Sequence, residues 1–285
     1  MTGPSLPAIG SLDLGRRAVL VTGGTRGIGR VIASRFLDAG AEVVVTGRTE
    51  PATPPSGTDG RTAAFVPADV RDPDQVAALV ETTVARLGRL DVLVNNAGGS
   101  PPADTATASP RFSEAVVRLN LLAPLWCAQR AYAVMRDQEA GGSIVNIGSV
   151  SGVRPSPGTA AYGAAKAGLI NLTQTLAVEF APTVRVNVVV AGLVRTEQAD
   201  LFYGDEAAVA AVGATVPLGR MATPDDIAGA CLYLASPLAA YVSGAALLVH
   251  GGGERPAYLD AARPGTAGPG TAGPGPDPTA PTDRR

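Results

Sequence analysis

The sequence has almost no lysine, histidine or cysteine. Lys166 is the single lysine among 23 basic residues, and His250 is the single histidine. The two cysteines, Cys127 and Cys231, stand in apolar, helix-like stretches with no second cysteine or histidine at ligand spacing. A disulfide framework and a structural zinc site are therefore disfavoured, and we expect no bound metal.

The sequence also lacks long apolar runs and a large excess of charge of either sign. No apolar run reaches the roughly 18 residues of a membrane span, and residues 1–14 place no positive charge ahead of an apolar core, unlike a secretory signal. The net charge is −2, with no basic block, which disfavours nucleic acid and anionic membrane surfaces as partners. With 285 residues, 46% of them apolar, the chain can bury a full core. We expect a cytoplasmic globular protein.

Between residues 17 and 250, short strand-like runs alternate with longer helical stretches. We expect strands at 17–22, 42–46, 64–67, 91–95, 143–148, 184–190 and 246–249, and helices at 27–39, 73–87, 111–137, 160–180 and 224–235. Several of the strands are nearly continuous apolar runs, which is typical of strands covered on both faces. The alternation predicts βαβ units. The expected fold is one doubly wound, Rossmann-type α/β domain, a parallel seven-stranded sheet with helices on both faces.

Three segments fall outside this alternation. Residues 50–62 contain three prolines and two glycines, and we expect a loop there. Residues 1–12 are expected to be a flexible lead-in. Residues 261–285, which are rich in proline and glycine, are expected to be a disordered tail. The folded domain is therefore expected over residues 13–260.

A glycine-rich turn joins the first expected strand to the first expected helix. It reads Thr22-Gly23-Gly24-Thr25-Arg26-Gly27-Ile28-Gly29. Glycine permits a tight turn at 23, close approach of a pyrophosphate at 27 and helix–strand packing at 29. The helix that follows offers free N–H groups and the positive end of its dipole to an anion. The turn therefore predicts a dinucleotide-binding site.

The spacing Gly-x-x-x-Gly-x-Gly after a threonine resembles the short-chain dehydrogenase/reductase family. Further pieces occur in the family's order: Asn95-Asn96-Ala97-Gly98 after the fourth strand, then Asn120, then Ser149 at the end of the fifth strand, then Tyr162-x-x-x-Lys166. The resemblance runs from about residue 14 to residue 253. Within the family, the chain resembles the 3-oxoacyl-[acyl-carrier-protein] reductase-like oxidoreductases.

Four residues are the expected catalytic set. Tyr162 and Lys166 lie four residues apart and share a helix face, where an ammonium favours the phenolate and brings the tyrosine pKa down from about 10. The resemblance implies that Tyr162 is the general acid of reduction and the general base of oxidation. It also implies that Ser149 hydrogen-bonds the substrate carbonyl, that Lys166 binds the nicotinamide ribose, and that Asn120 holds a water linking Lys166 to solvent.

The end of the second strand bears on the choice of cofactor. An NAD-preferring fold usually places an acidic side chain there, but this sequence has Arg48, and Arg26 lies in the glycine turn. Guanidinium groups pair well with a 2′-phosphate. The expected cofactor is therefore NADP(H), with NAD(H) as the alternative.

The resemblance implies further contacts with the adenine ring, the adenine ribose and the carboxamide of the nicotinamide. The full set of expected cofactor-binding residues is Gly23, Thr25, Arg26, Gly27, Ile28, Gly29, Arg48, Asp69, Val70, Asn96, Ala97, Gly98, Tyr162, Lys166, Gly192, Val194 and Thr196.

The sequence is less informative about the part of the site that would bind the substrate. Residues 195–219 are expected to form a lid which, with loops 99–102 and 150–159, gives a small, apolar lining whose main charges are Arg154 and Arg195. Ala191 replaces the proline that the family often has after the sixth strand, so a less rigid turn is expected. For His250 a structural or interface role is expected.

The expected function is NADP(H)-dependent hydride transfer between the nicotinamide and a ketone or secondary alcohol, of the carbonyl reductase type. A non-catalytic NADP(H)-binding sensor and an NAD-dependent alcohol dehydrogenase are the alternatives. The substrate is expected to be a small molecule, and 3-oxoacyl thioesters, steroid-like or polyketide ketones and small secondary alcohols all stay open. The expected helices 111–137 and 160–180 are apolar on more than one face, so a homodimer or homotetramer is expected.

Overall fold

The structure is a computed structural model that describes residues 12, 14–197, 204–254, 256 and 258–261. Most of the expected lead-in and tail lie outside the described residues. The chain divides into two units, residues 1–253 and 254–285. The described part of the second unit contains the short helix α9 (Tyr258–Ala261), which the sequence pattern did not predict. The remaining elements all belong to the first unit.

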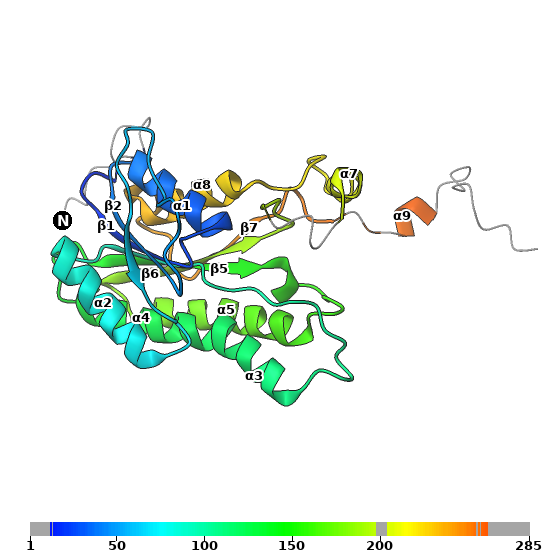
Figure 1. The fold of residues 1–285 in the computed structure, drawn as a ribbon, viewed down its shortest axis with the longest axis horizontal. Helices are drawn as coiled ribbons and strands as arrows, with labels where there is room; N and C mark the ends of the chain where they lie inside the picture. Colours follow the sequence, from blue (N-terminus) through cyan, green and yellow to red (C-terminus); the bar gives the residue numbers. More distant parts are fainter. Residues whose placement is uncertain (1–11, 13, 198–203, 255, 257, 262–285) are drawn as a thin grey trace, which may run out of the picture. The chain divides into compact units, whose positions relative to one another are not determined.

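Within its described residues, the first unit contains one parallel sheet. Its seven strands are β1 (Ala18–Thr22), β2 (Glu42–Gly47), β3 (Ala64–Pro67), β4 (Val92–Asn95), β5 (Gly142–Ser149), β6 (Val184–Ala191) and β7 (Ala246–Val249). They lie in the order β3-β2-β1-β4-β5-β6-β7 (Figure 1), with every neighbouring pair parallel. The predicted doubly wound fold is confirmed. The order reverses between β1 and β4, and such folds bind ligands beyond the carboxyl ends of the strands at this point.

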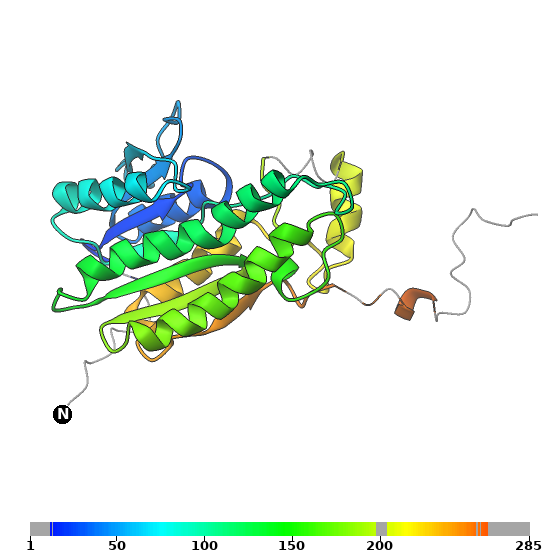
Figure 2. The ribbon, with the colours of Figure 1, turned by 90° about the horizontal axis from the view of Figure 1, so that it is seen from below.

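Helices cover both faces of the sheet. One face carries α1 (Gly27–Asp38) and α8 (Pro224–Ala235). The other carries α2 (Pro73–Leu87), α4 (Ala123–Met135) and α5 (Ala160–Glu179), and α4 and α5 lie in front of the sheet in Figure 2.

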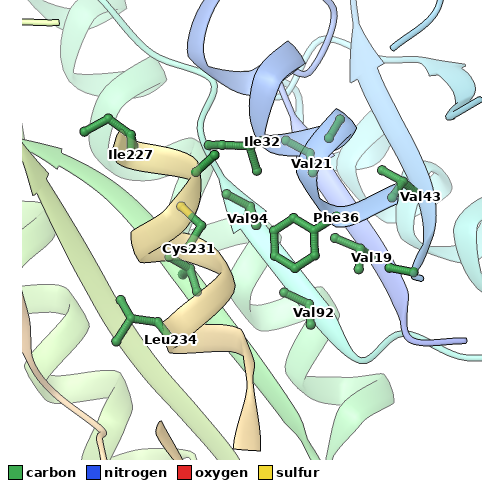
Figure 3. Packing of buried hydrophobic residues seen from close by; sticks show 14 of the residues in the cluster. Val19, Val21, Ile32, Phe36, Val43, Val92, Val94, Ile227, Cys231 and Leu234 are labelled. Carbon is green, nitrogen blue, oxygen red and sulfur yellow. The ribbon is translucent and has the colours of Figure 1, made fainter. Parts of the chain in front are cut away.

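The strands divide their apolar side chains between two cores. Val19 and Val21 of β1 belong to the core under α1 and α8, and Leu20 belongs to the core under α2 and α4. Because both faces are covered, successive residues of a central strand are all apolar. In the first core the ring of Phe36 on α1 packs with Val19 and with Val92 of β4 (Figure 3).

The helix predicted over residues 111–137 is wrong in one respect, because it is not a continuous α-helix. The structure has α3 (Pro110–Val117), a π-helical turn at Arg118–Leu122, and then α4. Pro124 has no N–H to donate to the carbonyl four residues earlier, on Asn120. The backbone widens instead, and the N–H of Ala123 bonds to the carbonyl of Arg118, five residues back.

The expected loop and the expected lid differ in secondary structure. Residues 50–62 form the predicted loop, closed by an isolated bridge between Ser56 and Thr62. The predicted lid, residues 195–219, contains the helix α7 (Glu206–Ala214). Its middle part, residues 198–203, lies outside the described residues.

Replacement of Phe36 tests the first core. Phe36 is fully buried, so Phe36→Ala should lower the free energy of unfolding by about 3–5 kcal/mol through lost burial and a residual cavity. Leu218→Ala is the control, because Leu218 is 73% exposed and its loss should stay within about 0.5 kcal/mol. Urea unfolding of both variants measures the difference, and equal losses would show that α1 does not pack on the sheet in this way.

Candidate active site

A cavity of about 920 Å³ lies at the carboxyl ends of the central strands. Its wall contains every residue of the expected site except Asn120. The structure therefore brings together segments that are spread from residue 23 to residue 196. The cavity is large enough for a dinucleotide, and its two ends differ in chemistry.

The glycine turn forms the floor of this cavity. Gly23 and Gly27 have φ of 63° and 54°, in the left-handed region that favours glycine. A Cβ on Gly29 would lie 2.3 Å from the carbonyl oxygen of Gly23 and from Nδ2 of Asn96, so only glycine fits there. The turn thus exposes bare backbone at the start of α1, as a phosphate cradle requires.

Hydrogen bonds tie this turn to the end of β4. Nδ2 of Asn96 donates to the carbonyl oxygens of Thr22 and Gly23, at 3.0 and 3.1 Å. In return, Oγ1 of Thr22 accepts from the backbone N–H groups of Asn96 and Ala97, both at 3.0 Å. The side chain of Asn96 therefore stabilises the glycine turn. These bonds hold the turn in its conformation without a contribution from a ligand.

Glu197 lies over the same turn. Its Oε1 accepts a hydrogen bond of 2.8 Å from the backbone N–H of Gly27, the first residue of α1. The carboxylate thus occupies the anion position at the helix N-terminus. Sequence reasoning missed this residue, because it is 170 positions away along the chain. A phosphate that binds to Gly27 has to replace it.

Lys166 is buried at the other end of the cavity. Its side chain projects from α5, it is 4% exposed, and Nζ donates to the carbonyl oxygen of Ile147 in β5 at 2.7 Å. Nζ also lies 5.6 Å from the ring centroid of Tyr162, one helical turn earlier. Burial lowers the pKa of Lys166 from 10.5 to about 8. At neutral pH the group is an ammonium beside the tyrosine ring.

Asn120 supports this end from behind the cavity wall. It is fully buried, its Oδ1 accepts from the N–H of Gly99 at 2.9 Å, and its Nδ2 donates to the carbonyls of Gly99 and Val116. A Cβ on Gly98 would lie 2.8 Å from this Oδ1 and 3.3 Å from Nζ of Lys166. The side chain of Asn120 thus fixes the backbone next to the lysine, and its role in holding a water stays a prediction.

Ser149 is the last residue of β5. Its Oγ accepts the backbone N–H of Ser151 at 3.2 Å and caps a short 3-10 helix, Val150–Gly152. Because the hydroxyl accepts from the protein, its own proton stays available to a ligand in the cavity. Ser149 and Tyr162 both line the cavity, as a carbonyl-binding pair requires.

Three arginines surround the opposite end. Arg26 and Arg48 were expected there, and Arg71 was not. Arg71 donates to Asp69 through Nε at 2.9 Å and Nη2 at 2.5 Å. These bonds, with a smaller contribution from the charge of Arg48, hold the pKa of Asp69 below its usual range. Arg71 could have been suspected only from its place two residues after Asp69.

The wall close to Tyr162 is mixed in polarity. Ser100, Ser151, Ser156 and Thr159 line the cavity together with Arg154, and Val150 and Leu193 add apolar side chains. The sequence did not single out these hydroxyl groups, because loop residues carry no periodicity that shows which side chains face a cavity. Residues 198–203 of the expected lid lie outside the described residues, so the small, apolar lining stays a prediction there.

The strand ends near His250 pack tightly. β6 continues through Ala191, and Gly192 donates its N–H to the carbonyl of Val249 at 3.0 Å. A Cβ on Gly192 would lie 2.7 Å from Cα of His250. His250 therefore lies against the backbone beside the cavity, and its structural or interface role stays a prediction.

The described residues contain two thiols but no cluster of metal ligands. No group of three or more His, Cys, Asp or Glu side chains in that part of the chain could hold a metal ion. Cys127 and Cys231 are buried free thiols, and burial raises the pKa of both, that of Cys127 to about 12. Across the same residues, no helix is long and apolar enough to cross a membrane.

Comparisons with known proteins show the family of this chain. A family model described as enoyl-(acyl carrier protein) reductase matches residues 23–254. The chain is 35% identical to the 3alpha-hydroxysteroid dehydrogenase of Mediterraneibacter gnavus, over 84% of this chain and 97% of that protein. It is 36% identical to the 3-oxoacyl-[acyl-carrier-protein] reductase of Chlamydia muridarum, over 83% and 96%.

A solved structure shows the same fold. The ligand-free aldohexose dehydrogenase of Thermoplasma acidophilum aligns with a TM-score of 0.79 and 31% identity, over 85% of this chain and 96% of that one. The matched proteins are oxidoreductases, and membership of their family implies a nicotinamide cofactor. The chain belongs to the short-chain dehydrogenase/reductase family.

The buried ammonium predicts a pH-dependent stability. Between about pH 8 and pH 10.5 the unfolded chain binds more protons at Lys166 than the folded protein does, so folding becomes more favourable as the pH rises. Relative to Lys166→Met, the cofactor-free protein should gain roughly 3 kcal/mol of unfolding free energy over this range. Urea unfolding of both proteins at several pH values measures the gain. A difference independent of pH would contradict a buried ammonium.

The contact of Glu197 predicts a competition with the cofactor. Glu197→Gln removes a negative charge from the N-terminus of α1, where the pyrophosphate is expected, so a dinucleotide should bind about three- to tenfold more tightly, with a smaller gain at high salt. Glu206→Gln is the matched control, because Glu206 pairs with Arg195 away from the turn. Calorimetric titration measures both affinities, and unchanged or weaker binding by Glu197→Gln would refute the competition.

Proposed function

We propose that this protein is an NADP(H)-dependent oxidoreductase that transfers a hydride between the nicotinamide and a ketone or secondary alcohol. One observation carries the proposal. Ser149, Tyr162 and Lys166 line one end of a single cavity, and three arginines line its other end. A dinucleotide with a 2′-phosphate fits this division, because its nicotinamide and its extra phosphate lie at opposite ends.

The chain's own residues supply the proton and the orientation. The hydroxyl of Tyr162 donates its proton to the carbonyl oxygen during reduction, and the hydroxyl of Ser149 donates a hydrogen bond to the same oxygen. The ammonium of Lys166 lies beside Tyr162 and stabilises the phenolate that remains. The bound NADPH supplies the hydride. In oxidation, Tyr162 accepts the proton. The family resemblance implies that Asn120 holds a water molecule that links Lys166 to solvent.

Cofactor binding is proposed to follow the glycine turn. The pyrophosphate takes the N–H of Gly27, and the 2′-phosphate pairs with Arg48 and Arg26. Arg71 adds a third guanidinium, although Asp69 already binds it. The carboxamide end lies toward Gly192, Val194 and Thr196 in this proposal.

The relatives support the reaction type rather than one substrate. Their names give a hydroxysteroid, a 3-oxoacyl group and an aldohexose. These substrates differ in size and polarity but share a hydroxyl or carbonyl carbon at which a hydride is exchanged. We therefore propose the carbonyl reductase type of reaction. The side chains of the cavity wall, rather than the relatives, indicate the class of substrate.

We also propose a homo-oligomer, a dimer or tetramer in the cytoplasm. β7 is an edge strand of the sheet, and Leu248 on it is 50% exposed. Tyr241 is fully exposed, and Tyr233 and Leu238 are also open. Light scattering of the purified protein measures its mass.

Arg48 tests the cofactor preference. The wild type should bind NADPH more tightly than NADH, and Arg48→Ala should weaken NADPH about 10- to 100-fold while NADH changes less than about threefold, because only NADPH carries the phosphate. Fluorescence titration measures all four affinities. Arg30→Ala is the control, since Arg30 bonds to the carbonyl of Thr53 outside the cavity. A wild type that prefers NADH would contradict the proposal.

Tyr162 tests catalysis. Tyr162→Phe should bind NADPH like the wild type but lose about 10²- to 10⁴-fold in turnover, because it lacks the transferred proton. Oxidation of NADPH with a panel of ketones measures the loss. Full turnover by this variant would refute the assigned role. Binding of NADPH by the wild type without turnover of any ketone or alcohol would favour a sensor instead.

A further inference from the structure

Three hydroxyl groups form a chain of hydrogen bonds along the wall near Tyr162. Oγ of Ser151 lies 3.0 Å from Oγ of Ser156, which lies 2.7 Å from Oγ1 of Thr159. Oγ1 of Thr159 also donates to the carbonyl oxygen of Ser156 at 3.1 Å. All three residues line the cavity. We call Ser151, Ser156 and Thr159 the hydroxyl chain.

The direction of the hydroxyl chain follows from its last member. A carbonyl oxygen only accepts, and a hydroxyl has only one proton to donate. Thr159 therefore donates its proton to the carbonyl oxygen and accepts a hydrogen bond from Ser156. Because Ser156 donates its proton to Thr159, it accepts from Ser151. The hydroxyl of Ser151 thus donates to Ser156, and its oxygen keeps lone pairs that can accept a hydrogen bond from a ligand.

Ser151 lines the same cavity as the residues proposed to bind the carbonyl. Its backbone N–H donates to Oγ of Ser149 at 3.2 Å, so the two serines are neighbours at the end of β5. In the proposed function, Ser149 and Tyr162 both donate to the carbonyl oxygen. The wall therefore offers two donors to one substrate oxygen and one acceptor beside them.

From this arrangement we infer that the substrate carries a hydroxyl on the carbon beside its carbonyl. It is an α-hydroxy ketone, reduced to a vicinal diol, and the inference rests on the proposed function. The substrate hydroxyl donates to Oγ of Ser151, while its carbonyl accepts from Ser149 and Tyr162. A ketone with only apolar neighbours gives the half-buried acceptor of Ser151 no partner, which weakens its binding relative to the hydroxy ketone.

Hydroxyacetone and methoxyacetone are the two probes. Both have an oxygen beside the carbonyl, but only hydroxyacetone has a proton to donate. The wild type with NADPH should show a kcat/KM at least about tenfold higher for hydroxyacetone, the effect of one hydrogen bond. Saturation-transfer NMR with the NADP+ complex measures binding without turnover, and hydroxyacetone should again give the stronger signal.

Variants of the hydroxyl chain give the sharper test. Ser151→Ala should bring the ratio of the two kcat/KM values close to one. Ser156→Ala should raise the activity with methoxyacetone, because the proton of Ser151 becomes free to donate to the ether oxygen. Thr175→Ala removes an exposed hydroxyl on α5 and should leave the ratio unchanged.

The outcomes separate this inference from the proposed function. Equal use of both probes by the wild type, a ratio unchanged in Ser151→Ala, or no binding of hydroxyacetone to the NADP+ complex would overturn the hydroxy ketone. Tight NADPH binding and turnover of apolar ketones would leave the oxidoreductase standing in those cases. If NADPH itself does not bind, the proposed function fails and the inference fails with it.

Discussion

The active site depends on the position of one buried ammonium group. Nζ of Lys166 bonds to the carbonyl of Ile147 and so joins α5 to β5. Gly98, after β4, has no room for a side chain between this nitrogen and Asn120. Two strand ends, the π-helical turn and α5 therefore meet at a single charge, for which an arginine would substitute a larger, planar guanidinium group. A sequence that otherwise uses arginine keeps its one lysine here.

The sheet topology gives the cavity two ends of different chemistry. The reversal of strand order between β1 and β4 opens a crevice, and the bonds between Thr22 and Asn96 hold its two sides together. On one side lie the helix N-terminus and the arginines, whose positive charge favours an anion. On the other lie Ser149 and Tyr162, which we propose as the pair that binds a carbonyl. A long dinucleotide is the kind of ligand that connects the two.

Much of this could be predicted from the sequence, because the fold and the cradle rest on local patterns. Buried strands, capped helices and a glycine turn each need particular residues nearby in the chain, and Tyr162 and Lys166 share a helix face. The π-helical turn was missed although Pro124 signalled a lost hydrogen bond. The contact of Glu197 with Gly27 and the hydrogen bond between Ser151 and Ser156 depend on the tertiary packing of loops, which follow no periodic sequence pattern. The hydroxyl groups of the cavity wall were not expected for the same reason.

A crystal structure of the protein with NADP+ tests the central claim most directly. The account predicts the 2′-phosphate within hydrogen-bond distance of Arg48, the pyrophosphate on the N–H of Gly27 with Glu197 moved away, and the nicotinamide ribose next to Lys166. A 2′-phosphate that points away from the arginines, or a nicotinamide outside the cavity wall formed by Ser149 and Tyr162, would contradict it.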